Sequence, residues 1–424
     1  MNSDAPQRRP LIAIACGGTG GHLFPGVAVG EELLGRGCDV MLIVSEKDID
    51  RRAAQGATGM EVVPLPAVGL SRNPIPFLLG LMKSRRTILQ TFRARRPKAV
   101  LGMGGFTSAA PILAGKAAGA KTFLHESNTI PGRANRWLSR KVDELFVWFP
   151  ETAARLTSTS AKSVGMPVRG EFRRSDAGDA REALGLDRDC PTLLVMGGSQ
   201  GAHSVNMAMI EAAPRICTET AGLQILHLTG ANDFEKVSSA YSSQGIRAVT
   251  RDFLDDMPTA LNAATLAVAR SGASSMAELA AVGTPSVLIP YPHAADNHQF
   301  HNANAFVTAT AAQMLGQSDM TAESLAEQVG ALLGDHDKLA AMAHNAAKRH
   351  EPNAARRIAD CIFAATDLCS ASEQVERKTS PLKEQPGNRA VELGTVDFGL
   401  EDFDHCHRRA SQPGSTEIVK GALS

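Results

Sequence analysis

Two stretches of the sequence repeat one pattern and decide the fold: LIAIACGGTGGH at residues 11–22 and LLVMGGSQGAH at residues 193–203. In each, a short apolar run leads into a glycine-rich turn and then into a stretch of helical character. Strand, glycine turn and helix in this order are typical of a doubly wound α/β domain. Because the pattern occurs twice, the sequence predicts two such domains that face a cleft, with ligands at the carboxyl ends of the strands.

Further short apolar runs extend both predicted sheets. The first sheet should contain strands at 11–16, 40–44, 99–101, 122–124 and 144–147, and the second strands at 193–196, 224–228, 266–269 and 286–289. Glycine and proline at 165–170 mark the linker between them. The predicted organisation is a flexible N-terminus at 1–10, a first domain at 11–168, a second domain at 169–365 and a disordered tail at 366–424, where the apolar periodicity stops.

Composition excludes several classes of protein. The 424 residues include 44 Lys and Arg against 44 Asp and Glu, and this balance argues against a general nucleic-acid binder. The seven cysteines are scattered without a CxxC pair, which is typical of a reducing compartment. No run of about 18 apolar residues predicts a transmembrane helix. The sequence favours a cytoplasmic protein, either soluble or peripheral to a membrane.

The glycine turns are candidate anion sites. A glycine turn lets backbone N–H groups approach a phosphate, and the helix that follows adds partial positive charge, although such a turn can also serve packing alone. The sequence has no GxxxxGK[ST] motif, and the first turn fails the GxGxxG dinucleotide pattern at Leu23. A third glycine turn, GMGGF at 102–106, could act with the first in holding a diphosphate.

The densest polar cluster is RSGASSMAE at residues 270–278. Amides and hydroxyls at a helix start suit a phosphate, and Glu278 one turn further could accept both hydroxyls of a ribose. An ordinary helix with a solvated glutamate explains the cluster equally well. The histidines and the aspartate at 293–298 favour a polar loop over a metal site. Three DxD-like triplets, at 48–50, 187–189 and 402–404, occur in unrelated contexts and favour chance.

Two residues are candidate general bases. His22 closes the first glycine turn, and Glu126 ends a predicted strand directly after His125. An imidazole at the carboxyl end of a strand suits proton transfer near neutral pH, although a lone histidine is more often structural. We take His22 as the first choice and Glu126 as the second.

Residues 70–100 carry eight basic side chains and no acidic one. Apolar residues precede most of the charges, and this order predicts contact with an anionic membrane surface. An amphipathic core helix with a solvated basic face is the alternative, and an RNA-binding patch is less favoured because only two aromatic rings are present. The predicted membrane contacts are Ile75, Phe77, Leu78, Leu81, Lys83, Arg85 and Arg86.

Eight motifs in order resemble the MurG family of glycosyltransferases. They cover roughly residues 10–365 and are GGTGGH at 17–22, GMGGF at 102–106, HESN at 125–128, GMPVR at 165–169, GGSQGA at 197–202, DFLDDM at 252–257, RSGASSMAE at 270–278 and PYPHAADNHQ at 290–299. Met166 and Ser127 depart from the residues common in that family. Neither departure removes a residue with an assigned role.

The resemblance implies a two-domain GT-B enzyme that needs no metal or other cofactor and takes UDP-N-acetylglucosamine mainly on its second domain. It implies that Leu254 contacts uracil through its backbone, that Glu278 binds the ribose and that Gln299 binds the sugar hydroxyls. The implied diphosphate contacts are Ser199 and the helix start formed by Ala273, Ser274, Ser275, Met276, Ala277 and Glu278. Residues from the first domain and the linker complete the donor site, namely Thr19, Gly20, Gly21, Asn128 and Arg169. The resemblance also implies that Gly104 and Gly105 face the acceptor diphosphate.

The resemblance also implies the reaction. N-acetylglucosamine moves with inversion to the C4 hydroxyl of a lipid-linked muramyl-pentapeptide at the cytoplasmic face of the membrane. Such an enzyme acts in cell-wall synthesis and, through it, in cell shape and division. Another GT-B glycosyltransferase, a UDP-sugar epimerase and a non-catalytic UDP-sugar-binding protein stay open as alternatives. Requirement for the lipid-linked acceptor separates the transferase from the epimerase.

Overall fold

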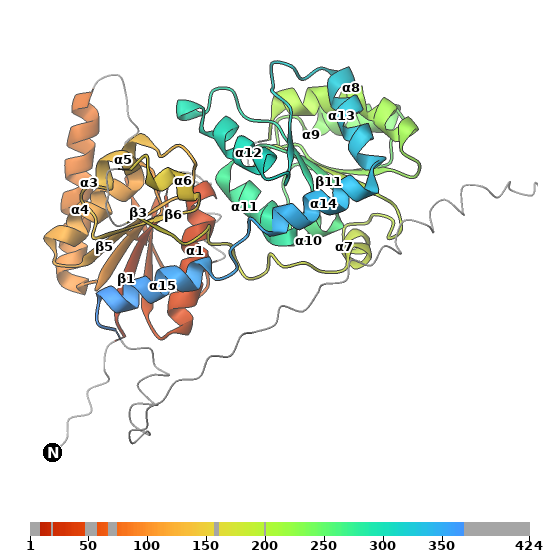
Figure 1. The fold of residues 1–424 in the computed structure, drawn as a ribbon. Coiled ribbons are helices and arrows are strands. Elements are labelled where there is room, and N and C mark those ends of the chain that lie inside the picture. The colour runs from red at the N-terminus through yellow and green to blue at the C-terminus, as the bar shows by residue number, and fades with distance from the viewer. Residues whose placement is uncertain are drawn as a thin grey trace, which may run out of the picture.

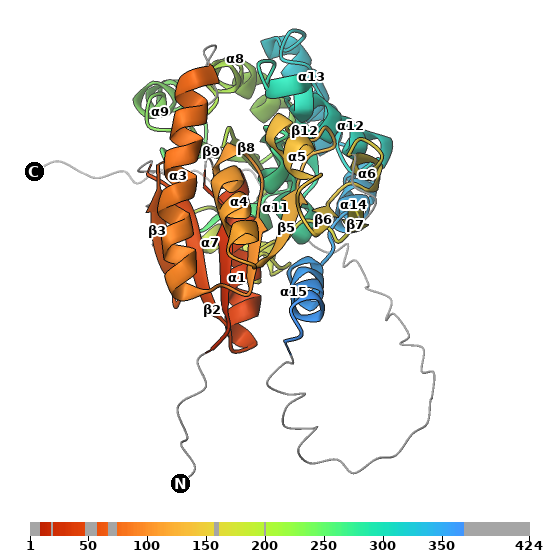
Figure 2. The ribbon, with the colours of Figure 1, turned by 90° about the vertical axis from the view of Figure 1, so that its left-hand side faces the viewer.

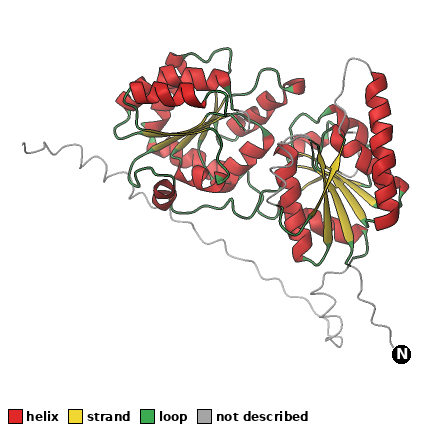
Figure 3. Ribbon diagram, turned by 180° about the vertical axis from the view of Figure 1, so that it is seen from behind, coloured by secondary structure: helices red, strands yellow, loops and turns green. Residues whose placement is uncertain are grey.

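The computed structural model describes residues 9–17, 20–46, 57–66, 74–156, 161–198 and 201–368. They form two α/β domains side by side, each a sheet with helices on both faces (Figures 1 and 3). This arrangement confirms the predicted fold class. The predicted N-terminal segment up to residue 8 and the predicted tail from residue 369 lie outside the described residues, as do Thr19 and Ser199.

The first sheet has seven strands in the order β3-β2-β1-β4-β5-β6-β7, and all neighbouring strands run parallel. The strands are β1 (Leu11–Ala15), β2 (Asp39–Ser45), β3 (Glu61–Leu65), β4 (Ala99–Gly102), β5 (Lys121–Glu126), β6 (Glu144–Val147) and β7 (Ala161–Ser163). The helices between them are α1 (Gly20–Gly35), α3 (Pro74–Arg95), α4 (Ala109–Ala117), α5 (Arg133–Leu138) and α6 (Pro150–Ala153), with a 3₁₀ turn η1 (Phe106–Ser108) before α4.

The second sheet has six parallel strands in the order β10-β9-β8-β11-β12-β13. The strands are β8 (Thr192–Met196), β9 (Gln224–Leu228), β10 (Ala248–Arg251), β11 (Leu266–Ala269), β12 (Ser286–Leu288) and β13 (Gln313–Met314). The helices are α7 (Ala177–Ala183), α8 (His203–Glu219), α9 (Phe234–Ser243), α10 (Met257–Ala263), α11 (Ala273–Val282), α12 (His298–Thr308), α13 (Ala322–Leu333) and α14 (His336–Ala347), with η2 (Ala295–Asn297) before α12.

Strand β1 shows why the central strands read as unbroken apolar runs. Its side chains alternate between two cores, because successive residues of a strand point to opposite faces of the sheet. Ile12 and Ile14 pack with residues of α1, while Leu11, Ala13 and Ala15 pack with α3 and α4. With both faces covered, no position in such a strand favours a polar side chain.

The sequence does not predict four strands, and these are the four sheet edges β3, β7, β10 and β13. Their burial explains the difference. Strands β3 and β7 are mostly exposed, and the two residues of β13 are only partly buried. An edge strand has one neighbour and less cover, so its sequence lacks the apolar run that identifies the central strands.

The last helix returns to the first domain. α15 (Ala354–Ala365) packs on α1, and Ile358, Ile362 and Phe363 enter the core that contains Ile12 and Ile14. Figure 1 shows α15 in blue beside the red α1. The predicted second domain extends to residue 365, whereas these side chains bury their apolar surface in the first domain. The chain therefore crosses between the domains twice.

Candidate active site

His22, the predicted base at the end of the first glycine turn, packs against the third glycine turn at 102–106. An ideal Cβ on Gly104 would lie 3.0 Å from His22 Cε1, and one on Gly105 would lie 3.4 Å from His22 Nε2. Gly104 has a φ of +113°, a conformation that residues with a side chain rarely adopt. The imidazole thus packs directly on the backbone of the third glycine turn. The structure brings His22 together with both predicted acceptor-diphosphate residues.

Two hydroxyl groups fix the Gly104 turn, a role that is not among the predictions from the sequence. Ser108 Oγ accepts a hydrogen bond from Gly104 N (3.2 Å) and donates one to Gly104 O (2.7 Å). Thr107 Oγ1 donates to Gly17 O, which ties the third glycine turn to the first. Small hydroxyl residues directly after a glycine turn are the sequence signal for such bonds. The backbone geometry beside His22 is therefore held from two directions.

The start of α11 faces the start of α1 across the two domains. Its N-cap residue Gly272 has no side chain to cap the first amides, so these N–H groups stay available to an anion. Ser274 Oγ donates to Gly21 O at 3.0 Å and joins the two helix starts directly. Both helix dipoles therefore direct partial positive charge to one place between the domains.

The predicted contact residues of α11 differ in how deeply their side chains are buried. Ala273, Met276 and Ala277 are buried in the core of the second domain, so their side chains do not reach the cleft. Ser274 and Ser275 stay partly exposed. Any contact of the first three residues with a diphosphate must use the backbone, as a helix N-terminus allows.

Glu278 and Arg169 form the electrostatic centre of the predicted donor site. Burial raises the pKa of Glu278 to about 7, and the positive charge of Arg169 opposes that shift. Arg169 Nη1 pairs with Glu171 at 2.8 Å, and its guanidinium lies 4.6 Å from the ring centroid of Phe24 on α1. The linker thus brings a cation from the domain junction toward the carboxylate. At neutral pH, Glu278 can exist in either protonation state.

The predicted uracil and sugar contacts flank α11. Leu254 follows the edge strand β10 and packs against the second-domain core. Gln299 is the second residue of α12, which follows β12, and its Oε1 accepts a hydrogen bond from Tyr291 N at 2.9 Å. That bond fixes the carboxamide and leaves its Nε2 to donate to a ligand. The two residues thus belong to segments that follow carboxyl strand ends on opposite sides of the central β8 and β11.

Glu126 is organised as a structural carboxylate. Its Oε1 accepts from Asn128 N (2.9 Å) and Asn128 Nδ2 (3.1 Å), and its Oε2 accepts from Gly132 N (3.0 Å) and Asn135 Nδ2 (2.8 Å). The side chain is 1% exposed. With four donors on its two oxygens and no exposed surface, Glu126 is poorly placed to reach a substrate hydroxyl. The geometry favours a positioning role over that of the alternative base.

The second glycine turn is pressed against the end of β9. Gly201 has a φ of +74°, and a Cβ there would lie 2.1 Å from Thr229 O. Asn206 Nδ2 donates to the same carbonyl at 2.8 Å and to Asp233 Oδ2 at 2.8 Å. These contacts hold the described part of the turn beside α8. Ser199, the predicted phosphate contact of this turn, lies outside the described residues.

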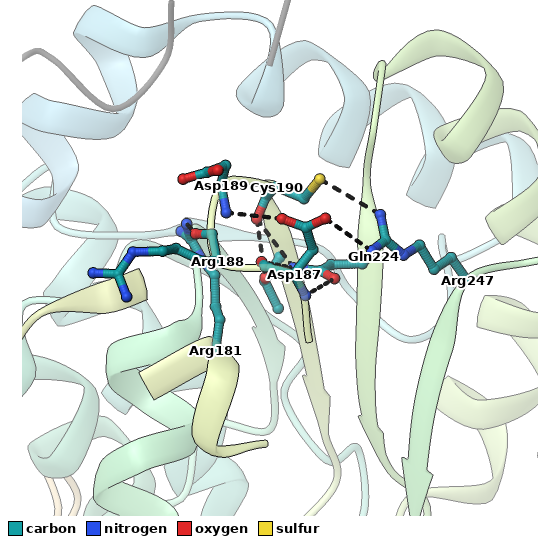
Figure 4. A network of polar contacts seen from close by, with 8 residues as sticks. Arg181, Asp187, Arg188, Asp189, Cys190, Gln224 and Arg247 are labelled. Carbon is teal, nitrogen blue, oxygen red and sulfur yellow. Dashed lines mark hydrogen bonds and ion pairs between the residues drawn. The ribbon is translucent and has the colours of Figure 1, made fainter. Parts of the chain in front are cut away.

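The described DxD-like triplet lies at the other end of the second sheet. Asp187 Oδ2 accepts from Arg247 Nη2 (3.1 Å), and Asp187 N donates to Gln224 Oε1 (2.9 Å), as Figure 4 shows. This network precedes β8, at its amino end, whereas ligands of such sheets bind at carboxyl ends. The network therefore serves to fasten the segment between α7 and β8. In the 293–298 loop, Asp296 pairs with Arg136 of α5 at 2.6 Å.

Helix α3 presents some of the predicted membrane contacts on its exposed face and packs others against the first domain. Ile75, Leu78, Leu79 and Met82 are 52–65% exposed. Phe77, by contrast, makes an edge-to-face contact with Phe106, and Leu81 packs against two cores. Leu79 and Met82 therefore replace Phe77 and Leu81 on the exposed face. Figure 2 shows α3 along the outside of the first domain, and its Lys83, Arg85 and Arg86 are exposed.

Two buried histidines make stability depend on pH. Burial lowers the pKa of His125 from 6.5 to about 4 and that of His227 to about 3. His125 Nε2 lies 2.9 Å from Gly165 O, and His227 Nδ1 lies 2.8 Å from Tyr241 Oη. Each of these histidines binds a proton near pH 6.5 in the unfolded chain but stays neutral in the folded chain. The folded state therefore has its full stability above pH 6.5 and loses stability as the pH falls toward 4.

We expect the melting temperature to fall as the pH is lowered from 6.5 to 4. Each unit by which burial lowers a histidine pKa changes the free energy of unfolding by about 1.4 kcal/mol. Glu278 acts in the opposite direction, because its raised pKa removes stability as pH rises from 4.5 to 7. Thermal denaturation of His227→Asn, with the exposed His336→Asn as control, checks the expectation. It would be wrong if His227→Asn retained the wild-type slope.

Known proteins resemble this chain over both domains. The Glycosyltransferase family 28 N-terminal domain matches residues 12–147, and the Glycosyltransferase family 28 C-terminal domain matches residues 192–358. A relative from Anaeromyxobacter sp. (strain Fw109-5) is 37% identical over 90% of this chain and 98% of its own length. One from Geobacter sulfurreducens is 36% identical over 84% and 98%. Both are named UDP-N-acetylglucosamine–N-acetylmuramyl-(pentapeptide) pyrophosphoryl-undecaprenol N-acetylglucosamine transferase.

Solved structures also resemble this chain over both domains. MurG of Acinetobacter baumannii aligns with a TM-score of 0.65 and 26% identity, covering 84% of this chain and 99% of that one. A UDP-N-acetylglucosamine 2-epimerase aligns with a TM-score of 0.60 at 15% identity, covering 89% and 100%, and shares the fold alone. Because the transferases match in sequence over nearly their whole length, this chain belongs to glycosyltransferase family 28 and, within it, to the MurG family of N-acetylglucosaminyltransferases.

Proposed function

We propose that this chain transfers N-acetylglucosamine from UDP-N-acetylglucosamine to the C4 hydroxyl of undecaprenyl-diphosphate-linked N-acetylmuramyl-pentapeptide. The observation that carries the proposal is the contact between Ser274 and Gly21, which sets an uncapped helix N-terminus beside His22. Such a site suits a leaving diphosphate next to a general base. The names of the relatives supply the two substrates. The proposed reaction is a step of peptidoglycan synthesis.

The proposed mechanism is a single displacement. His22 takes the proton from the muramyl C4 hydroxyl while that oxygen forms a bond to the anomeric carbon of the donor. The bond from the anomeric carbon to the diphosphate oxygen breaks, and UDP leaves with its electron pair. The α11 amides stabilise the charge that develops on the diphosphate. Attack from the opposite face inverts the configuration, so no covalent enzyme intermediate forms.

The two domains divide the substrates. We assign the donor to the second domain, with Leu254 at uracil, Glu278 at the ribose, the start of α11 and Ser199 at the diphosphate, and Gln299 at the sugar. Thr19, Gly20, Gly21, Asn128 and Arg169 complete the donor site. The acceptor diphosphate lies at Gly104 and Gly105. The first domain also meets the membrane, which gives a peripheral enzyme on the cytoplasmic face.

A transfer assay with labelled UDP-N-acetylglucosamine tests the proposal. We expect a labelled lipid product only when the lipid-linked muramyl-pentapeptide is present. Conversion of the donor without acceptor would support an epimerase, and donor binding without turnover would support a binding protein. Both outcomes contradict the proposal.

Membrane contact through α3 gives a separate prediction. No helix in the described ranges is long and apolar enough to cross a bilayer. The exposed apolar face of α3 adjoins exposed basic residues, a combination that binds anionic surfaces. Burying an apolar side chain such as leucine or methionine contributes up to about 1.5–3 kcal/mol. We therefore expect Leu78→Gln/Leu79→Gln/Met82→Gln to lower co-sedimentation with anionic vesicles at least tenfold.

The control changes an exposed apolar residue of the second domain. Phe253→Gln replaces an apolar side chain that is 54% exposed in the second domain and should leave co-sedimentation unchanged. Raising the salt concentration should weaken binding of the wild type, because surface charges are screened. Equal co-sedimentation of the triple variant and the wild type would contradict the contact.

A further inference from the structure

A fully buried asparagine joins the two domains. Asn302 on α12 is 0% exposed. Its Oδ1 accepts from Thr129 N and from Thr129 Oγ1, each at 3.0 Å. Its Nδ2 donates to Asn128 Oδ1 at 3.0 Å and to Ser271 O at 3.4 Å. Three of the four hydrogen bonds of this second-domain side chain therefore reach the first domain, and its carboxamide has no further bond to make.

On the first-domain side, these bonds lead toward the predicted base. Asn128 donates to Glu126, whose other oxygen accepts from Asn135 Nδ2. Asn135 Nδ2 also donates to His125 O at 3.2 Å, and it lies 3.2 Å from the point where a Cβ of Gly104 would be. His22 packs on that same glycine. The contacts thus run without a gap from Asn302 to the proposed acceptor side of the cleft.

On the second-domain side, the bonds lead to the proposed donor site. Ser271 Oγ donates to Gln299 O at 2.8 Å, which joins the segment before α11 to the first residues of α12. Asn302 follows Gln299 by three residues and lies on the same helix face. A shift of either donor segment therefore moves the Asn302 side chain.

We propose that Asn302 is a positioning residue that couples occupancy of the donor site to the geometry of the acceptor side. The inference rests on the donor site assigned above. Separation of the domains would leave the buried amide and its partners without hydrogen bonds, which is unfavourable. The two domains therefore either keep all of the Asn302 hydrogen bonds or move far enough apart for water to replace them. A donor that aligns the Ser271 and Gln299 segments favours the made contact, and with it the aligned Asn128–Glu126 segment.

The test measures coupling between the two substrates. The affinity of the wild type for a short-chain, water-soluble analogue of the lipid-linked acceptor is measured by calorimetry with and without UDP. Couplings of this kind amount to about 5- to 150-fold. We expect such a gain in the wild type and a factor near one in Asn302→Ala. We also expect kcat of Asn302→Ala to fall by up to about 100-fold, because a small misplacement of catalytic groups lowers the rate by that order. UDP affinity should change little.

Two further variants distinguish a positioning role of Asn302 from a purely structural role. Asn304→Ala changes an exposed asparagine on the same helix and should retain the wild-type coupling. Thr129→Val removes one hydrogen bond of Asn302 from the first domain, without a change in the donor site. It should reduce coupling but not UDP affinity, and its effect should not add to that of Asn302→Ala, because both remove one interaction.

Two results would overturn the inference. One is full coupling in Asn302→Ala. The other is loss of UDP affinity in Asn302→Ala together with normal coupling in Thr129→Val, which would make Asn302 a mere support of the donor pocket. A wild type that fails to bind UDP contradicts the donor site itself and is recognised before any variant is made.

Discussion

Replacement of His22 by alanine is expected to lower kcat about 10²- to 10⁴-fold at saturating acceptor, the usual contribution of general acid–base catalysis. UDP affinity should change little, because the proposed diphosphate amides belong to α11. His22→Asn keeps a polar side chain but cannot take the proton, so it should be impaired to a similar degree. Added imidazole should restore part of the activity of His22→Ala.

The control for this prediction is the exposed His336 on α14. His336→Ala should retain the wild-type kcat. Because the His22 ring packs on Gly104, the melting temperature of each variant shows whether the turn is intact. A near-normal kcat in His22→Ala would remove His22 from the role of base.

Loss of the Glu278 carboxylate is expected to raise the dissociation constant for UDP-N-acetylglucosamine about 10- to 100-fold. A hydrogen bond to a charged group contributes about 1.5–3 kcal/mol, and Glu278→Gln replaces the charged acceptor of two ribose hydroxyls with a neutral one. The measurement is calorimetric titration with UDP-N-acetylglucosamine. Glu219→Gln is the matched control, since its exposed carboxylate pairs with Arg215 on α8, outside the proposed donor site.

The pH dependence sharpens this prediction. The pKa of Glu278 is raised to about 7 by burial, and the ribose hydroxyls bind the ionised form. Donor affinity of the wild type should therefore be constant above about pH 7 and fall as pH decreases below it. The same titration of Glu278→Gln should show no such break. A wild-type affinity that is flat from pH 5.5 to 8 would contradict the proposed ribose contact.

The sequence predicts the central strands of both sheets and misses the edges. β1 and β8 read correctly because burial on both faces leaves only apolar positions. β7 and β13 carry no comparable run, since an edge strand has a partner on one side only. The return of α15 to the first domain is equally hidden, because an amphipathic helix shows that one face is buried but not against which sheet.

The candidate site divides in the same way. His22 and Glu278 follow from a glycine turn and a helix start, which are local patterns. The difference between Phe77, which packs on Phe106, and Leu79, which is exposed, depends on where α3 lies. Asn302 carries a weak local signal, since asparagine is unfavourable inside a helix unless its side chain has specific partners. Its first-domain partners, Asn128 and Thr129, lie more than 170 residues away in the sequence.

The sequence alone determined two doubly wound domains, the glycine turns and the family, because strand burial and turn backbone depend on residues that are close along the chain. Tertiary structure decided how the domains meet: Ser274 on Gly21, Asn302 on Thr129, and α15 on the first core. It also made Glu126 a structural carboxylate by surrounding it with four donors. Contacts between distant segments have no local pattern, since any surface with matching donors, acceptors and shape can make them.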